Sequence, residues 1–510
     1  MFLALLALVG LLTALIISYQ FRYWTRRGVP QLQPSFPFGN FGEFFRQQHG
    51  IPMTYANLYA KTKHLPYAGI YLSIQPSLLI NDPQMVKNIL TRDFEHFHDR
   101  GVHVNEETDP LSGNLFSLGG VKWKNLRAKL TPTFSSGCLK AMFPILVQKA
   151  MLLQNRFQIE TSSQGAIEVK EMATRYTTDV IASVAFGIDI DSINNKDELF
   201  HTMGKKIFKQ DLQTSLRLAL AIFFPRLKAL LGFNMVAPEI EDFMINVVQK
   251  TLDQRERDGV PRKDMMQLLL QLRNTGTVSL SDEQWKLDAT TTAKNLTINE
   301  VAAQAFVFFV AGYETSSTLM SFCLFELARN YEIQAKVHQE IDSILSRYGG
   351  AITYDNLAEM KYLECCLDET MRKHPPVPFL NRECTKAYRI PGTDVTIDKG
   401  TPVVVSVLGM QRDSQHFPQP YEFQPERFSS SSSGEQASQD KAYFPFGGGP
   451  RLCIGLRMGV LQTKVALVAL LVKFRFSLAN KEDYRRELPL DAKSMLMATR
   501  DGIRLVADAR

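Results

Sequence analysis

The first residues of the chain are almost wholly apolar, and positive charge follows them. Residues 1–21 contain no charged side chain, and Arg22, Arg26 and Arg27 come soon after. A cleaved signal peptide carries its charge before the apolar core, whereas charge after the core holds the following chain in the cytosol. We therefore expect residues 1–21 to be an uncleaved transmembrane signal anchor, near the short limit for spanning a bilayer. A signal peptide is the alternative.

Prolines shape the next segment. Pro30, Pro34 and Pro37 predict a stiff, extended, basic tether over residues 22–40, because proline fixes φ and cannot continue a helix. Length alone suggests about three domains. No comparable linker follows, however, so we expect residues 41–510 to form a single catalytic domain.

Helical periodicity dominates the rest of the chain. Successive amphipathic helices are predicted over residues 139–260, within which the unusually apolar residues 216–236 form either a buried helix pair or a second membrane contact. Alternating apolar residues predict a hairpin at 67–80 and short strands at 389–397 and 401–408. The predicted fold class is therefore mainly α with small β-sheets (α+β).

The longest predicted helix begins with a capping box at residues 297–300 and extends to about Arg329. Such a helix is roughly 50 Å long, enough to cross the domain. Glu314 interrupts its apolar body, so we do not expect it to span a membrane. Gly312, in its middle, would let a flat cofactor approach the backbone, and Thr315 would bond back to the Ala311 carbonyl and bend the helix.

Composition excludes several classes of protein. A net charge of +6, from 58 Lys and Arg against 52 Asp and Glu, is too small to indicate nucleic-acid binding. The six cysteines are scattered, without the density of a disulfide scaffold or paired metal-ligand spacing, which fits a reducing compartment.

The strongest chemical signal is the run Phe-Gly-Gly-Gly-Pro-Arg-Leu-Cys-Ile-Gly at residues 446–455. Three successive glycines predict a tight loop. A helix is predicted from about Leu456, so Cys453 would lie at its N-terminus, where the helix dipole and free N–H groups stabilise a thiolate. Such a thiolate is a metal ligand or a nucleophile. A phosphate loop would end in Gly-Lys-Ser/Thr, and a nucleophile would need a nearby histidine; both are absent from this stretch.

The loop closely resembles the haem-binding loop of the cytochrome P450 family at Phe446, Gly447, Gly449, Arg451, Cys453 and Gly455. The resemblance implies a helical prism that holds haem b between the long central helix and the cysteine loop. It makes Cys453 the axial thiolate of the iron and places Phe446 and Gly455 against the cofactor.

Other motifs extend the resemblance. Trp123 and Arg127 match the helix that binds a haem propionate, although alone they indicate only an amphipathic helix. By resemblance Arg382 and Arg451 pair with propionates, and Ala311 lies against the haem. Glu314 and Thr315 resemble the oxygen-activating acid–alcohol pair of the family, although alone they would indicate a kinked core helix. The order of the remaining motifs implies a buried structural triad of Glu369, Arg372 and Arg427.

The anchor, tether and central-helix motif look most like insect microsomal P450s that handle foreign compounds. This implies a monooxygenase that inserts one oxygen atom from O2 into lipophilic substrates, either xenobiotics or endogenous lipids and hormones. Electrons would come from NADPH through a flavin-containing P450 reductase, with cytochrome b5 as a further donor. The location would be the cytosolic face of the endoplasmic reticulum membrane. The expected pocket wall is apolar: Phe116, Phe306, Phe309, Val310, Val377, Leu380, Met495 and Leu496.

Two other functions remain open from the sequence. One is a haem-thiolate isomerase or dehydratase of oxidised lipids, and the other is a non-catalytic haem sensor. Neither needs proton delivery to dioxygen, so the intact Glu314 and Thr315 pair argues against both.

Overall fold

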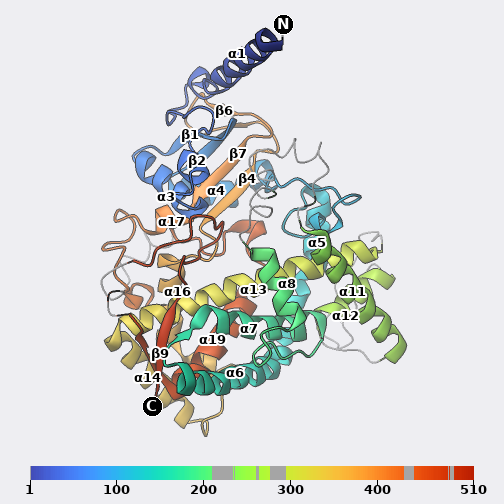
Figure 1. Cartoon of the computed structure of the whole chain (residues 1–510), viewed down its shortest axis with the longest axis vertical. Helices are drawn as coiled ribbons and strands as arrows, with labels where there is room; N and C mark the ends of the chain where they lie inside the picture. Colours follow the sequence, from blue (N-terminus) through green and yellow to red (C-terminus); the bar gives the residue numbers. More distant parts are fainter. Residues whose placement is uncertain are drawn as a thin grey trace.

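The computed structural model describes residues 2–209, 217, 234, 236–259, 264–275, 295–429, 442–480, 482 and 487–510. Most of the apolar segment at 216–236 therefore lies outside the described residues, as does its predicted role as a buried pair or membrane contact. Within the described chain, helices form the bulk of the molecule, and the strands lie in two places, most of them near the N-terminal helix and others near the C-terminus (Figure 1). The predicted fold class is confirmed.

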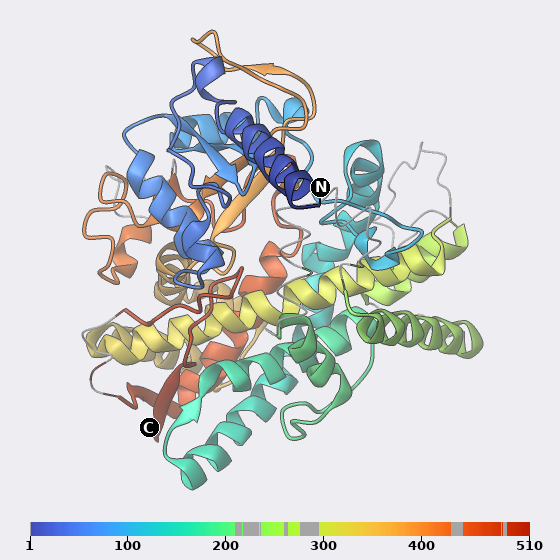
Figure 2. The same cartoon turned by 45° about the horizontal axis from the view of Figure 1, so that its top comes forward.

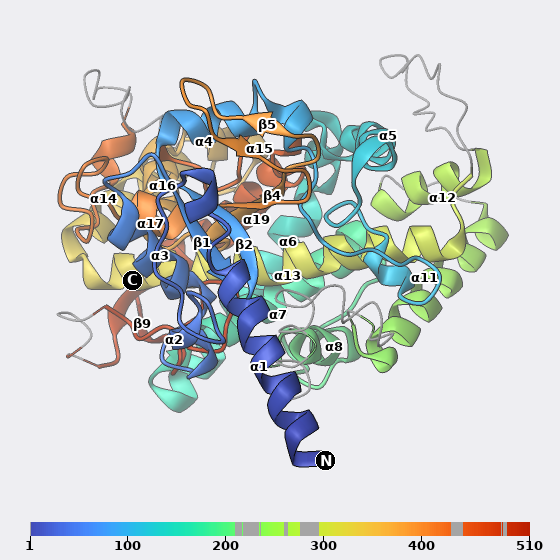
Figure 3. The same ribbon diagram turned by 90° about the horizontal axis from the view of Figure 1, so that it is seen from above.

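The N-terminal helix stands apart from the fold. Helix α1 (Phe2–Gln20) projects away from the body of the molecule (Figure 1, Figure 3). Three described helical stretches are long and apolar enough to cross a membrane, but they differ in burial. The most apolar window of Phe2–Arg27 is 7% buried, against 39% for Ser136–Ser163 and 67% for Ile298–Arg329. The first stretch thus leaves most of its apolar surface uncovered.

The proline-rich segment is only partly extended, because it contains a 3-10 helix at Thr25–Arg27 and a turn at residues 36–38, and it packs on the domain. Trp24 is fully buried, and its Nε1 donates a hydrogen bond to the Ile70 carbonyl at 3.2 Å. A Cβ on Gly69 would lie 2.3 Å from the Trp24 ring, so glycine is required there. The Gly69 N–H also donates to the Pro30 carbonyl at 2.7 Å. Residues 30–32 therefore pair with the sheet at Gly69, through a single bridge between Gln31 and Gly69.

The strands form three sheets. The largest has the order β1-β2-β7-β4, in which β2 and β7 are parallel and the other pairs antiparallel. Its strands are β1 (Tyr67–Leu72), β2 (Gln75–Ile80), β7 (Pro402–Ser406) and β4 (Phe379–Glu383). The smaller sheets contain β3 (Ile167–Glu168), β9 (Arg504–Ala509) and β8 (Phe474–Leu478), and β5 (Tyr388–Arg389) and β6 (Thr396–Ile397). The hairpin predicted at 67–80 is confirmed.

Helices build the remaining body. The described helices other than α1 are α2 (Gly42–Phe45), α3 (Ile51–Thr62), α4 (Pro83–Leu90), α5 (Gly120–Leu130), α6 (Ser136–Gln164), α7 (Val169–Ile181), α8 (Leu199–Phe208), α11 (Pro238–Asp258), α12 (Met265–Thr275), α13 (Ile298–Arg329), α14 (Tyr331–Ser346), α15 (Tyr354–Glu359), α16 (Lys361–Lys373), α17 (Val407–Gln411) and α19 (Leu456–Lys473).

Helix α13 is the central element. It crosses the molecule from α11 and α12 to α14 and α16 (Figure 2). Thr297 and Glu300 form the predicted capping box, in which the Thr297 side chain accepts from the Glu300 N–H and the Glu300 carboxylate accepts from the Thr297 N–H. Helices α7 and α19 pack along α13, and most of its residues are buried. An accessible residue on such a helix marks a local opening.

Candidate functional site

The cysteine loop is shaped by glycines. Gly449 has φ +65°, and a Cβ there would lie 1.7 Å from the Leu90 carbonyl oxygen, so no side chain fits. The loop closes where the Cys453 N–H donates to the Phe446 carbonyl at 3.1 Å. Helix α19 begins at Leu456, directly after its N-cap Gly455. Cys453 therefore sits just ahead of the helix, as the glycine pattern predicts.

The Cys453 side chain is accessible, yet protein surrounds it. Burial raises the pKa of its thiol, while the Gly455 N–H and the charges of Arg100 and Arg127 act in the opposite direction. The Gly455 N–H and the guanidinium groups of Arg100 and Arg127 thus all place positive potential at the Cys453 sulfur. A cation bound there would complete deprotonation, because metal coordination removes the thiol proton.

Four guanidinium groups face the same space. Arg451 donates to the carbonyls of Phe116 at 3.3 Å and Leu118 at 2.6 Å, and Arg100 donates to the Phe116 carbonyl at 3.1 Å. Arg451 also lies over the Trp123 ring, 4.2 Å from its centroid. We call this set the arginine cradle: Arg100, Arg127, Arg382 and Arg451.

The cradle carries more positive charge than its surroundings neutralise. Burial lowers the pKa of Arg100, and repulsion from Arg382 and Arg451 lowers it further. Burial also lowers the pKa of Arg382 and of Arg451 to about 10. The buried Nε atoms of both have no hydrogen-bond partner among the described residues. Unsatisfied buried donors are costly, so the cradle fits an anionic group with several oxygen acceptors, such as the two propionates of haem.

Arg100 was missed by the sequence reasoning. Its place depends on β4, because the Asn381 side chain donates to the Arg100 carbonyl at 2.7 Å and the Glu383 N–H donates to Asp99 O at 2.9 Å. Those partners lie some 280 residues away along the chain. No local pattern around Arg100 indicates this pairing.

The middle of helix α13 is less buried than the rest of it, and its partly exposed positions include Val307, Val310 and Gly312. Ala311 is exposed and Thr315 is partly exposed, although most of the helix is buried. The Thr315 hydroxyl donates to the Ala311 carbonyl at 2.7 Å, the back-bond that the sequence predicts. The next residue, Ser316, accepts from Gln462 of α19 at 2.5 Å, which ties this turn to the helix behind Cys453.

The small size of Gly312 also serves the packing of α13. A Cβ on Gly312 would lie 2.9 Å from Cδ1 of Ile181. The glycine therefore lets α13 approach α7 closely. Because successive residues of a helix point about 100° apart, Ala311 and Gly312 face different neighbours.

Glu314 is buried and paired. Its Oε1 lies 2.9 Å from Nζ of Lys170 on α7, and the Thr318 hydroxyl donates to the same oxygen at 3.4 Å. Lys170 also donates to the hydroxyls of Ser317 and Thr318. The acid of the predicted acid–alcohol pair is thus held by a cation that the sequence reasoning missed, 144 residues upstream.

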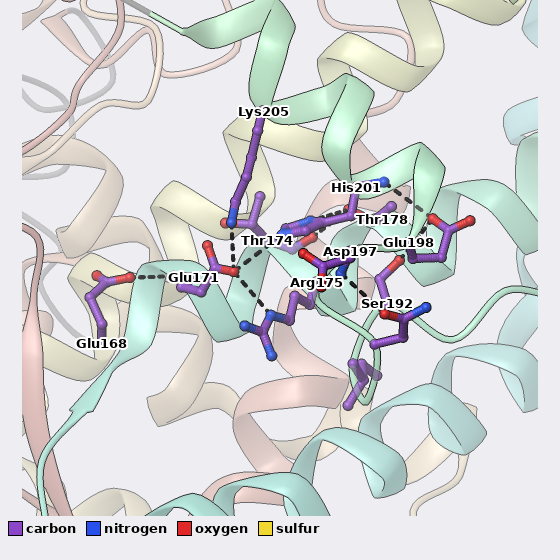
Figure 4. A network of polar contacts seen from close by, with 12 residues as sticks. Glu168, Glu171, Thr174, Arg175, Thr178, Ser192, Asp197, Glu198, His201 and Lys205 are labelled. Atoms are coloured by element: carbon purple, nitrogen blue, oxygen red, sulfur yellow. Dashed lines mark hydrogen bonds and ion pairs between the residues drawn. The ribbon is translucent and has the colours of Figure 1, made fainter. Parts of the chain in front are cut away.

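The residue next to Lys170 anchors a second polar network (Figure 4). One oxygen of Glu171 lies 3.0 Å from Arg175, 3.2 Å from His201 and 2.8 Å from Lys205. Burial alone would raise the pKa of Glu171, but His201 and Lys205 hold it well below its ordinary value. The network fastens α8 to α7 beside the Lys170 and Glu314 pair.

The structure brings Glu369, Arg372 and Arg427 together in the core. Both oxygens of Glu369 bind Arg372, at 2.7 and 2.9 Å, and Nε of Arg427 lies 3.4 Å from Oε1. Arg372 also donates to the carbonyls of Gln411 and Pro420, each at 2.9 Å. These contacts join α16 to the segment before the cysteine loop, so the geometry is that of a scaffold.

The candidate pocket residues divide by burial. Phe309 is fully buried and packs on Phe186, Phe200 and Tyr313, which places it in the core and not on an accessible wall. Phe306 is 5% exposed, whereas Phe116 is 43% exposed. The remaining candidates are partly exposed: Val310, Val377, Leu380, Met495 and Leu496. Leu380 Cδ2 lies 3.7 Å from the Cβ position of Gly447, beside the cysteine loop.

Comparison with known proteins agrees with this geometry. The family model for cytochrome P450 matches residues 30–505, which include the cysteine loop, the cradle and α13. The chain belongs to the cytochrome P450 family. Similar relatives include cytochrome P450 6d3 of Musca domestica, 39% identical over 92% of each chain. Probable cytochrome P450 6d5 and cytochrome P450 6a2 of Drosophila melanogaster are each 38% identical, over 90% and 98% of each chain.

This P450 chain is therefore a haem-thiolate monooxygenase of the insect type, an oxidoreductase that depends on haem. The predicted enzyme class, a monooxygenase, is confirmed.

Proposed function

We propose that the chain is a membrane-anchored monooxygenase that uses haem b, with Cys453 as axial ligand, to oxidise lipophilic molecules. The observation that carries this proposal is the arginine cradle beside an accessible cysteine. Four guanidinium groups, two with unpartnered buried Nε atoms, share one space with the sulfur. When bound there, haem supplies dioxygen activation, which thiolate ligation favours.

The chain's own residues then hold the cofactor and control protons. The cradle binds the propionates, with Trp123 stacked on Arg451. Phe446 and Gly455 shape the loop that carries Cys453, and Ala311 is an exposed position of α13 that would lie against the haem. The Thr315 hydroxyl is positioned to hold water at this opening.

Glu314 is the proposed proton source for that water. Its ion pair with Lys170 holds the carboxylate on the α7 side of α13. Glu314 must therefore exchange Lys170 for water and accept a proton from that water before it passes a proton to the Thr315 side. Lys170, 26% exposed, gives this pair a connection to solvent.

The proposed substrates are lipophilic xenobiotics or endogenous lipids and hormones. Support comes from the apolar partly exposed residues around α13 and from α1, which would concentrate such molecules at a membrane. We place the catalytic domain on the cytosolic face of the endoplasmic reticulum. Arg22, Arg26 and Arg27 follow the apolar helix, as the positive-inside rule requires.

The proposed electron donor is a flavin-containing NADPH P450 reductase, with cytochrome b5 as a second donor. Lys124 and Lys129 of α5 are basic residues near the cradle that suit an acidic partner. No role for nucleic acid is proposed.

The test is the absorption spectrum of the reduced protein with carbon monoxide. A strongly red-shifted Soret band supports haem with a thiolate ligand, and its absence in folded protein would refute the proposal. Turnover is then measured with lipophilic substrates in the presence of reductase and NADPH. Product formation that does not require NADPH would contradict the monooxygenase assignment for this chain.

A further inference from the structure

Asp99 lies at the centre of the elements that form the cradle. It directly precedes Arg100, and its carbonyl accepts from the N–H of Glu383, which follows Arg382 on β4. Its carboxylate oxygen Oδ1 accepts from the Gly120 N–H at 2.8 Å, at the start of the helix that carries Trp123 and Arg127. Asp99 therefore contacts the elements that supply three of the four cradle arginines.

The carboxylate has little freedom to move. Oδ1 also lies 2.6 Å from Nδ1 of His98. A Cβ on Gly119 would lie 2.6 Å from both carboxylate oxygens, so the glycine makes room for the acid. The carboxylate is thus fixed against the N-terminus of α5, where a negative charge is also stabilised by the helix dipole.

Asp99 is also the counter-charge of the cradle. Its Oδ1 lies 3.6 Å from Nη2 of Arg451. Among the described residues, this is the one ion pair that any of the four cradle arginines makes. Two haem propionates would neutralise two of the four guanidinium charges, and Asp99 reduces the remaining excess from two positive charges to one.

We propose that Asp99 is an electrostatic positioning residue, whose negative charge lowers the reduction potential of the bound haem. Reduction adds an electron, so positive surroundings favour the reduced state and negative ones disfavour it. The inference rests on the proposed haem site. It adds to that site an acid that sets how readily the haem accepts its first electron.

The experiment compares the haem midpoint potential of wild-type protein, Asp99→Asn and a control, Glu95→Gln. Asparagine keeps the shape and an acceptor oxygen for the Gly120 N–H but removes the charge. We expect Asp99→Asn to favour the reduced state by up to about tenfold, which equals about 59 mV for one electron. Glu95 lies in the same segment, 72% exposed and 3.3 Å from His96, and its replacement should leave the potential unchanged.

The outcomes separate this inference from the haem proposal. A wild-type protein without the thiolate-type carbon monoxide band refutes the haem proposal itself. A haem-loaded Asp99→Asn protein with that band and an unchanged potential overturns the inference alone. Asp99→Ser, a smaller neutral variant, provides a second measurement if Asp99→Asn retains no haem. Failure of both variants to retain haem in folded protein also overturns the inference, because removing a negative charge should hold propionates more tightly.

Discussion

At Cys453 the surrounding protein opposes the charge state that a metal ligand needs. Burial raises the pKa of the thiol, and the Gly455 N–H, Arg100 and Arg127 compensate only in part. The iron must supply the remainder, as coordinating cations do. Because the ligand and the cradle share one electrostatic field, loss of the sulfur should affect the site far more than loss of any other cysteine.

We expect Cys453→Ser to lose the thiolate-type carbon monoxide spectrum and all monooxygenase turnover, because serine is a poor ligand at neutral pH. Cys365→Ser, at a partly buried position of α16, is the control and should retain both. The measurement is the reduced carbon monoxide difference spectrum, followed by product formation. An active Cys453→Ser enzyme would refute the ligand assignment.

We expect Thr315 to affect the fraction of electrons that form product more than the rate at which electrons reach the haem. Thr315→Ala removes the hydroxyl that bonds the Ala311 carbonyl and holds water. Product formed per NADPH should fall several-fold while peroxide rises, with the haem spectrum unchanged. Thr315→Ser retains the hydroxyl and should restore most of the coupling. Equal coupling in the alanine and wild-type enzymes would exclude the proposed role.

The buried ion pair of Glu369 and Arg372 predicts a large effect on stability. Glu369→Gln would leave the fully buried Arg372 without its counter-charge, which costs about 3–5 kcal/mol. The exposed pair of Arg347 and Glu359 is the comparison, where Glu359→Gln should cost far less because solvent screens the two charges. Denaturant unfolding measures both. Similar losses in the two variants would contradict the scaffold role.

Among the elements, α13 has two tasks. It lines the site, and it also positions the loop of residues 113–116. Gln304 is 1% exposed; its Oε1 accepts from the Leu115 N–H at 2.8 Å and its Nε2 donates to the Gly113 carbonyl at 3.0 Å. This loop continues to Phe116, whose carbonyl receives Arg100 and Arg451. Gln304 thus holds the loop that contains Phe116, which is both a candidate pocket residue and the residue whose carbonyl accepts from two cradle arginines.

We expect Gln304→Leu to weaken substrate binding, raising KM or the spectral dissociation constant several-fold with a smaller change in kcat, because Phe116 loses its support. Gln334→Leu is the matched control. Gln334, on α14, is equally buried and donates to the carbonyls of Leu327 on α13 and Phe476 on β8, each at 2.9 Å. It should lower thermal stability without changing KM. Unchanged KM in Gln304→Leu would show that the loop holds its place by other contacts.

Local elements were predictable where the determining contacts are local. The capping box at Thr297 and the glycine loop before α19 depend on neighbours within a few residues, and both appear in the structure. Arg100 and Lys170 were missed because their partners lie on β4 and α13, far along the chain. Gly312 shows a further limit. The motif marked a position that requires a small residue, but only the packing of Ile181 shows why.

At the scale of the whole molecule, a buried charge cluster joins the end of α13 to the end of α16. Nε2 of His374 lies 2.6 Å from Glu326, Lys373 lies 3.0 Å from the same carboxylate, and the His374 ring stacks on Phe322. Burial lowers the pKa of His374 to about 4, although Glu326 acts in the opposite direction. Burial would raise the pKa of Glu326, but His374 and Lys373 lower it to about 2.

These values predict how stability depends on pH. The unfolded chain protonates His374 near pH 6.5, whereas the folded chain resists protonation until about pH 4, so its contribution is present above 6.5 and lost as pH falls. At pH 5 the loss is about 2 kcal/mol. Protonation of Glu326 lowers the stability of the fold only below about pH 4.5, which lies outside the range from pH 7.5 to 5. We therefore expect the thermal midpoint to fall by a few degrees across this window.

Two variants test whether His374 causes this pH dependence of the thermal midpoint. His374→Phe can still stack on Phe322 but cannot titrate, so its thermal midpoint should start lower and change less between pH 6.5 and 5. His49→Asn, at an exposed position, should retain the wild-type slope. If His374→Phe keeps the full slope, the acid sensitivity arises elsewhere, and another buried histidine, His338, becomes the next group to replace. Burial lowers its pKa to about 4 as well. A flat wild-type profile with a changed slope in His374→Phe would instead mean that other groups offset His374, because burial raises the pKa of Asp179 and of Asp368 to about 6 and their protonation stabilises the fold across the same window.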